Sequence, residues 1–289
     1  MSVLHAIVLG LVQGLTEFLP VSSSGHLILV PWLFGWDDFS GNEALERGFD
    51  VALHLGTLVG AVAYLRRDIM RYLGAGAQWL VNRGPLTGDA RVAWLLVATA
   101  VPSAVIGVVV LVVGGDPGDR IWLVAVCLAV FGVLLRIADG RPGERQPTDL
   151  RFAEAFLLGA AQSLAFQPGV SRAGVALTTA RWLRIDRAEA ARFVFLMSLP
   201  VIAGAGLVKL GDLAVPGGWW PAFVFGTAAA ALSGWVAVGW MLRFLISDRL
   251  RWLHGLPPCG RSDGAGPAGH LLAVGVETGP RWVWPRGRH

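Results

Sequence analysis

Hydrophobic residues predominate in five long segments of this chain that are bounded by polar residues. A helix needs roughly 20 apolar residues to cross the hydrocarbon core of a bilayer. The segments cover about 49–65, 92–113, 121–137, 193–210 and 219–242. The pattern therefore predicts an all-α polytopic membrane protein with five full spans.

Two further apolar segments are interrupted in the middle by polar and helix-breaking residues. Residues 2–35 are broken at Pro20 and the cluster Ser22–Gly25, and residues 152–183 are broken at Pro168-Gly169. Irregular backbone at membrane depth is tolerated only where it is buried in protein or faces water. Each segment is therefore predicted to be a re-entrant, broken helix pair.

Arginines between the apolar segments predict the orientation, because basic loops stay on the cytoplasmic side. The arginine-rich loops are 66–91, 136–151, 181–192 and 243–252, whereas 36–48, 114–120 and 211–218 are expected outside. This alternation holds only if the segment 152–183 enters and leaves the membrane on the same side.

The two broken segments resemble each other, which predicts an inverted-topology repeat. When Gln13 is set against Gln162 without a gap, Ser22 meets Ser171 and Gly25 meets Gly174. Three spans separate the copies, so the second copy must be inverted, as in many proteins that build a polar site at the bilayer midplane. We expect one membrane domain, 1–254. Its repeats are about 1–140 and about 150–254.

The second repeat shows two spans after its broken segment where the first shows three. Residues 255–289 are rich in Gly, Pro and Arg and hold a single short apolar run, Leu271–Val276. This composition predicts a polar, disordered tail. The sequence therefore predicts that the final transmembrane span is missing or altered.

Composition agrees with a membrane protein and excludes several other classes. The 289 residues are 54% hydrophobic and 15% charged, whereas a soluble domain carries about 25% charged residues. The net charge of +4 comes from arginines beside the spans, which indicates contact with membrane lipids and not with nucleic acid. Two cysteines, Cys127 and Cys259, make neither a disulfide framework nor a metal site.

Glu17 is the first candidate for chemistry, because a carboxylate in an apolar segment needs a partner. Gln13 lies one helical turn earlier on the same face. The pair could hold a divalent cation, Mg²⁺ or Ca²⁺, or a substrate hydroxyl, and Glu17 could instead act as a base for His26. The plainer alternative is a helix-end charge at the lipid–water boundary.

The residues Ser22, Ser23, Ser24 and Gly25 form a turn that opens a helix. Such a turn offers hydroxyl and backbone N–H groups to an anion, and a simple N-cap is compatible with the same residues. His26 follows, and its imidazole could attack phosphorus or deprotonate a serine that does so. The alternative is a core histidine with its hydrogen bonds satisfied.

Arg172 is a guanidinium within the second broken segment, next to Gly169, Ser171 and Gly174. An intramembrane arginine needs an anionic partner, and its planar fork suits a phosphate. A plain ion pair with Glu17 is the alternative. The pattern assigns Asp50, His54 and Glu154 to helix ends or interfaces, without a functional role.

The run from Gln13 to His26 and the run from Pro168 to Gly174 resemble the two signature motifs of the undecaprenyl-diphosphate phosphatases, or bacitracin-resistance proteins. The resemblance covers roughly residues 1–250. It implies a bacterial inner-membrane enzyme that hydrolyses undecaprenyl diphosphate to undecaprenyl phosphate and phosphate. This reaction recycles the lipid carrier of peptidoglycan synthesis and confers bacitracin resistance.

The resemblance also implies roles for single residues. Glu17 matches the acidic metal ligand or base, Ser23 and His26 match the nucleophile and the acid/base in an order left open, and Arg172 matches the phosphate clamp. The remaining substrate-binding matches are Gln13, Ser22, Ser24, Gly25, Gly169, Ser171 and Gly174. The chain departs from the family in the uncharged Gln13 and in Ala173, where a serine is common.

The predicted site binds a prenyl diphosphate lipid together with a divalent cation and opens toward the outer side of the membrane. A homodimer is left open. The rival hypothesis is a lipid-phosphate flippase or transporter that uses the same pocket, because inverted repeats with broken helices are typical of secondary transporters.

Overall fold

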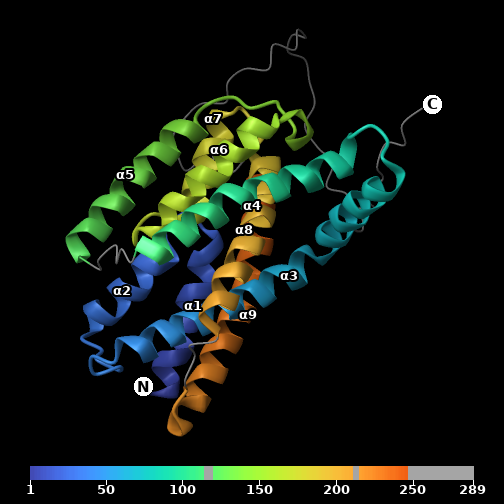
Figure 1. Ribbon diagram of the computed structural model, residues 1–289. Helices are drawn as coiled ribbons and strands as arrows, with labels where there is room; N and C mark the ends of the chain where they lie inside the picture. The colour runs from blue at the N-terminus through green and yellow to red at the C-terminus, as the bar shows by residue number, and fades with distance from the viewer. Residues whose placement is uncertain (114–119, 211–214, 247–289) are drawn as a thin grey trace, which may run out of the picture.

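The computed structural model describes residues 1–113, 120–210 and 215–246. Across these residues the chain forms nine α-helices, three short 3₁₀ turns and no strand (Figure 1). The helices long and apolar enough to cross a membrane are α3 (Glu43–Asn82), α4 (Gly88–Val113), α5 (Ile121–Asp139), α8 (Arg187–Leu210) and α9 (Trp220–Ile246). The prediction of an all-helical, multi-pass membrane protein with five spans is confirmed. The predicted tail, 255–289, lies outside the described residues.

Four shorter helices carry the two broken segments. They are α1 (Val3–Phe18), α2 (Ser23–Phe34), α6 (Phe152–Gln162) and α7 (Arg172–Trp182). The first pair breaks at Leu19–Ser22, and the second breaks at a 3₁₀ turn, Ser163–Phe166, and the loop that follows it. Both breaks fall where the sequence predicts them.

Each second helix of a pair starts from a serine cap. The Ser22 hydroxyl accepts a hydrogen bond from the Gly25 N–H at 3.3 Å, and the Ser171 hydroxyl accepts one from the Gly174 N–H at 3.1 Å. Ser22 holds a φ of +64°, a conformation that non-glycine residues rarely adopt. The cap therefore comes with local backbone strain at the start of α2.

Glycines let α1, α3 and α9 approach at backbone distance. A Cβ on Gly14 of α1 would lie 2.0 Å from the Ser233 hydroxyl, and a Cβ on Gly60 of α3 would lie 2.1 Å from the carbonyl oxygen of Ala231. Small residues at such seams drive helix association in membranes, where dispersion contacts and hydrogen bonds replace the hydrophobic effect. We call this three-helix contact the glycine seam.

A second close contact joins α4 to α6. A Cβ on Gly159 would lie 2.0 Å from the carbonyl oxygen of Thr99. The Ser103 hydroxyl donates to the Gly159 carbonyl at 2.8 Å, just as the Ser233 hydroxyl of α9 donates to the Gly10 carbonyl of α1 at 3.3 Å. In both contacts a serine on a long span holds a glycine on a short helix.

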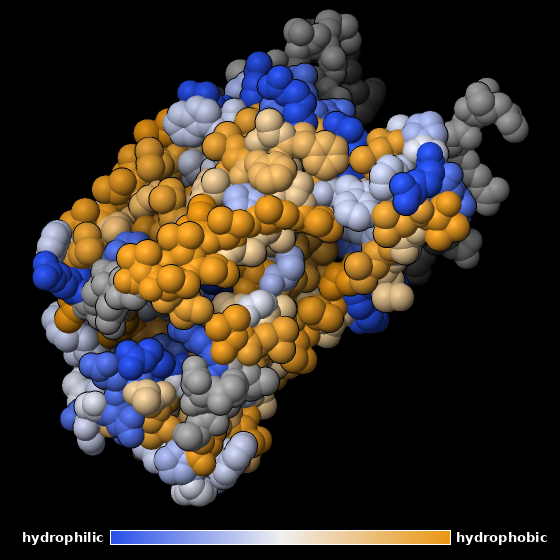
Figure 2. All heavy atoms as spheres, viewed as in Figure 1, coloured by the Kyte–Doolittle hydropathy of each residue, from blue (hydrophilic) through white to orange (hydrophobic). Residues whose placement is uncertain are grey.

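The helix α3 is longer than the sequence pattern predicts. The predicted span ends before Arg66-Arg67, where hydropathy falls, but the helix continues to Asn82 and turns back into α4. In Figure 1 this hairpin leans away from α8 and α9 and stands off the helix bundle. Figure 2 shows hydrophobic residues over the middle of this face and hydrophilic residues toward its ends.

Arginines bind the loop before α6 to the turn between α7 and α8. The side chain of Arg187 pairs with Asp139 at 2.8 Å, and Arg145 pairs with Glu154 at 2.8 Å. Buried Arg181 donates to the backbone carbonyls of Arg141 and Ile185. We call this group the arginine clamp.

Candidate active site

Glu17 lies at the end of α1 and is the centre of a buried polar cluster, with 7% of its surface exposed. Its Oε2 atom accepts hydrogen bonds from the Gln13 amide at 2.9 Å and from the Ser23 hydroxyl at 2.5 Å. Gln13 comes from the same helix one turn earlier, and Ser23 is the first residue of α2. The break between α1 and α2 therefore folds the serine back onto the carboxylate.

Two cationic or ionisable side chains from other helices complete the cluster. Arg172, the first residue of α7, places a guanidinium nitrogen 3.5 Å from Glu17 Oε1. His54 of α3 places Nε2 at 3.5 Å from Glu17 Oε2. Because desolvation makes a lone buried carboxylate costly, these four neighbours explain how Glu17 is accommodated in an apolar helix.

His54 is the one member of this cluster that the sequence pattern does not predict, because the pattern assigns it to a helix end or interface. Its Nδ1 atom lies 2.8 Å from the Asp50 carbonyl oxygen, which can only accept a hydrogen bond. The Nδ1 atom therefore carries a proton and Nε2 faces the carboxylate. The available signal was the presence of an ionisable side chain in a predicted span.

His26 lies one turn into α2 and is oriented by its own backbone. Its Nδ1 atom lies 2.8 Å from the carbonyl oxygen of Ser22, so Nδ1 donates and Nε2 is left available as a base or nucleophile. No hydrogen bond joins His26 to Glu17 in the part of the chain described. The alternative in which Glu17 serves as a base for His26 is thus not the arrangement observed, because Glu17 pairs with Ser23.

The two broken segments meet at their breaks. The Ser171 hydroxyl lies 3.5 Å from the carbonyl oxygen of Leu19. A Cβ on Gly25 would lie 3.3 Å from the Val124 side chain and 3.5 Å from Gly169. Gly169 has a φ of +89°, and a Cβ there would lie 2.6 Å from the Val124 carbonyl oxygen, so this position requires glycine.

The predicted site residues therefore lie close together in space. Ser24 joins them through its hydroxyl, 3.3 Å from that of Ser22, and Gly174 lies against the Pro20 carbonyl. The catalytic and binding roles assigned to these residues stay predictions.

A divalent cation would find a limited set of ligands here. The Gln13 Oε1 atom is buried and has no hydrogen-bond partner among the described residues, and it is a hard oxygen beside Glu17. Those residues contain no group of three or more His, Cys, Asp or Glu side chains that could hold a metal. The donors fit a cation that takes its other ligands from substrate phosphates and water, as Mg²⁺ often does.

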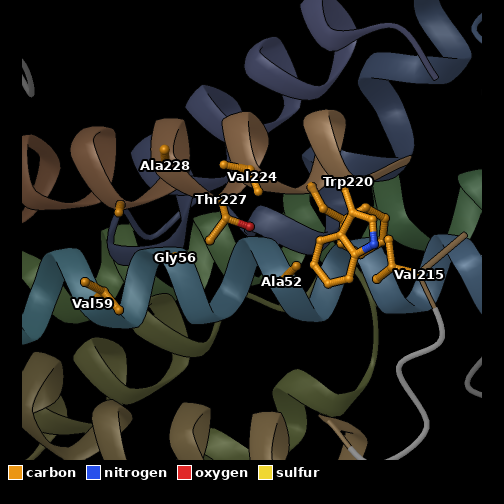
Figure 3. A pocket seen from close by; sticks show the side chains of 10 residues that line it. Ala52, Gly56, Val59, Val215, Trp220, Val224, Thr227 and Ala228 are labelled. Carbon is orange, nitrogen blue, oxygen red and sulfur yellow. The ribbon is translucent and has the colours of Figure 1, made fainter. Parts of the chain in front are cut away.

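An apolar pocket of about 390 Å³ lies elsewhere, between α3 and α9 (Figure 3). It is lined by Ala52, Gly56, Val59, Val215, Trp220, Phe223, Val224, Thr227, Ala228 and Ala231. None of the predicted site residues lines it. The polar cluster around Glu17 is therefore the better candidate for chemistry.

Comparison with known proteins identifies relatives over most of the chain. The family described as "Bacitracin resistance protein BacA" matches residues 6–254. An undecaprenyl-diphosphatase of Pelotomaculum thermopropionicum is 42% identical over 250 residues, covering 85% of this chain and 89% of the relative.

Two further relatives carry the same name. The undecaprenyl-diphosphatase of Geobacter metallireducens is 43% identical over 260 residues, covering 85% of this chain and 90% of the relative. That of Rubrobacter xylanophilus is 42% identical over 256 residues, covering 87% and 93%. The chain belongs to the bacitracin resistance protein BacA family.

Proposed function

We propose that this chain hydrolyses undecaprenyl diphosphate to undecaprenyl phosphate and inorganic phosphate. The observation that carries the proposal is the 2.5 Å hydrogen bond from the Ser23 hydroxyl to Glu17, with Arg172 on the other carboxylate oxygen. A serine hydrogen-bonded to a carboxylate, with a guanidinium on the other carboxylate oxygen, is an arrangement suited to attack on a phosphorus centre. The names of the relatives agree with this activity.

In the proposed reaction, Glu17 takes the Ser23 proton while the serine oxygen attacks the terminal phosphorus. The phosphoanhydride P–O bond breaks and undecaprenyl phosphate leaves. Arg172 stabilises the charge that develops on the phosphoryl oxygens, because its fork donates to two of them. Water then cleaves the phosphoserine, which releases phosphate and restores the hydroxyl.

His26 is the second candidate nucleophile, since its Nε2 atom is left available by the Nδ1 contact to Ser22. Transfer of a radiolabelled terminal phosphate from the substrate to the enzyme separates the two candidates, because the acid stability of the labelled protein identifies the phosphorylated residue. A phosphoserine survives acid, whereas a phosphohistidine is hydrolysed by acid and survives alkali. We expect the acid-stable label.

We further propose that a divalent cation, Mg²⁺ or Ca²⁺, binds at Glu17 and Gln13 together with the diphosphate. The unpartnered Gln13 Oε1 atom supports this assignment. When bound, the cation offsets the charge of the diphosphate and so favours its departure.

We also propose that the fold is an inverted repeat with two re-entrant helix pairs, in a bacterial inner membrane, with the site opening outward. The matched serine caps and the exchanged serine–glycine contacts between α1 and α9 and between α6 and α4 support it. The alignment that pairs Gln13 with Gln162 sets Phe166 opposite Glu17, so one repeat alone carries the carboxylate.

Phosphate release from C15 or C55 prenyl diphosphate in detergent tests the activity. We expect Ser23→Ala to lower kcat/KM by at least about 10²-fold, the size of a lost catalytic proton transfer. Ser198→Ala is the matched control, because this buried hydroxyl bonds only to its own helix. Full activity in Ser23→Ala would refute the proposed nucleophile. The flippase alternative gains no support from the relatives, which are named as hydrolases.

A further inference from the structure

The end of α3 and the turn into α4 form a hairpin that extends past the apolar part of its span. The helix has 40 residues, or about 60 Å at 1.5 Å per residue, whereas the hydrocarbon core is about 30 Å thick. The residues from Arg66 to Asn82 therefore have to lie in the interface or beyond it.

One face of this extension is packed against the protein. Gly76 lies against Ala93 of α4, Trp79 meets Trp94 edge to face with ring centroids 5.7 Å apart, and the Arg71 side chain binds Asp89. These contacts make the hairpin a rigid unit and fix which residues point away from it.

The opposite face is an apolar stripe with no cover among the described residues. Its members recur three or four residues apart, which places them on one side of a helix. The stripe consists of Met70, Leu73, Ala77, Leu80 and Val81. These side chains are highly exposed, with Leu73 64% and Val81 81% exposed. The contacts between α3 and α4 therefore do not cover the stripe.

Arginines flank the stripe, and their positive charge is not paired with acidic side chains in the ranges described. Arg66 and Arg67 precede it and Arg83 follows it, all three exposed and without an acidic partner in the ranges described. The acidic residues of the hairpin are already paired, Asp68 with Arg192 and Asp89 with Arg71. Hydrophilic and hydrophobic residues lie side by side at the hairpin tip in Figure 2, at the upper right.

We propose that the stripe of the α3–α4 hairpin is a docking surface for anionic phospholipid on the arginine-rich side of the bilayer. An apolar stripe flanked by basic residues is the pattern of a helix that lies in the membrane interface. Figure 1 shows the extension leaning away from α8 and α9, and a helix segment that leans away from the spans can lie along the bilayer surface. The arginines then reach lipid phosphates while Leu73 and its neighbours enter the acyl boundary.

A spin label on the full chain in nanodiscs tests the docking. Cys127 and Cys259 are replaced by serine, and the label is placed at Leu73→Cys in the stripe or at Gln78→Cys, an exposed polar control position on the same helix. In nanodiscs of phosphatidylcholine with phosphatidylglycerol, we expect the Leu73 label to collide with oxygen and to be shielded from a water-soluble nickel complex. The Gln78 label should show the reverse.

The charge dependence is tested with matched arginine variants. Arg67→Gln should lower the ratio of docked to undocked hairpin by roughly five-fold, the change that corresponds to about 1 kcal/mol for one basic residue near an anionic surface. Arg136→Gln, an exposed arginine at the end of α5, should leave the ratio unchanged. Omitting phosphatidylglycerol should reduce docking in the same way as Arg67→Gln.

Three results would overturn the proposal. A Leu73 label exposed to water in anionic nanodiscs would show that lipid does not cover the stripe. If the shielding of the Leu73 label did not change when phosphatidylglycerol is omitted or Arg67 is replaced, the partner would not be an anionic lipid. Spin–spin coupling between labels on two chains would show that a second copy covers the stripe instead.

Discussion

At the scale of single residues, Glu17 depends on side chains that reach it from four helices. Gln13 and Ser23 are close in sequence, so helical spacing and the break after α1 could predict their contacts. Arg172 could be predicted only from the need of an intramembrane charge for a partner. The same need applies to His54, an ionisable side chain in a predicted span, but its contact with Glu17 arises from the packing of α3 against α1, which the local sequence pattern does not specify.

Replacing His54 tests its place in the cluster. His54 Nε2 lies 3.5 Å from Glu17 Oε2 as an ion-pair contact. We expect His54→Ala to lower kcat/KM for phosphate release about ten-fold, which corresponds to about 1.4 kcal/mol. His54→Gln keeps an amide near Glu17 and should recover part of the loss. His5→Ala, at the far end of α1, is the control, and an equal loss there would point to general instability.

The uncharged Gln13 predicts a specific response to metal. Gln13→Glu replaces an amide donor with a second carboxylate beside Glu17, and a buried like-charge pair is costly without a cation. We expect the Tm in EDTA to fall by more than about 5 °C, since each kcal/mol lowers it by about 2–4 °C at this size. Mg²⁺ or Ca²⁺ should restore it. Gln78→Glu, on the surface of α3, should show no such metal response.

At the scale of helices, hydropathy predicted where spans and breaks lie but not where α3 ends. The predicted span stops at Arg66-Arg67 because a membrane helix loses its apolar character there. The helix continues because the residues up to Asn82 include no proline and are mostly good helix formers, such as Arg, Leu, Ala and Gln. Hydropathy indicates whether a helix is surrounded by lipid or by water, whereas helix propensity and packing determine where the helix ends.

The glycine seam gives a prediction at this scale. Gly60→Ala places a Cβ 2.1 Å from the Ala231 carbonyl oxygen, so α3 and α9 must separate and the Tm should fall by several degrees. Gly74→Ala lies on the same helix with open space around it and should raise the Tm slightly, because alanine favours helix by about 1 kcal/mol. Similar effects of the two substitutions would show that the seam is not tightly packed.

At the scale of the whole molecule, the arginine clamp joins the loop before α6 to the turn between α7 and α8. Hydrogen bonds from the Arg145 guanidinium, with one from the Arg151 backbone, lower the pKa of Glu154 from 4.5 to about 2. The sequence pattern predicts Glu154 at a helix end or an interface, and Glu154 lies in the first turn of α6. Its partner Arg145 could not be chosen from among many loop arginines by sequence alone.

The clamp predicts a pH dependence of stability. Because folding lowers the Glu154 pKa, its contribution is complete above about pH 4.5 and is lost as the pH falls toward about 2. Glu154→Gln should therefore lower the Tm at pH 7, and the gap to the wild type should narrow below about pH 4.5. Thermal melts at stepped pH measure it. A gap that is constant across this range would exclude ionisation of Glu154 as the cause.

The glycine seam also limits how a long isoprenoid could thread through the protein. The backbone of α9 contacts α1 at Gly14 and α3 at Gly60, so a chain of methylene groups cannot pass between these helices at those two positions. A tail attached to a diphosphate at Glu17 would therefore have to leave by a route that crosses neither contact.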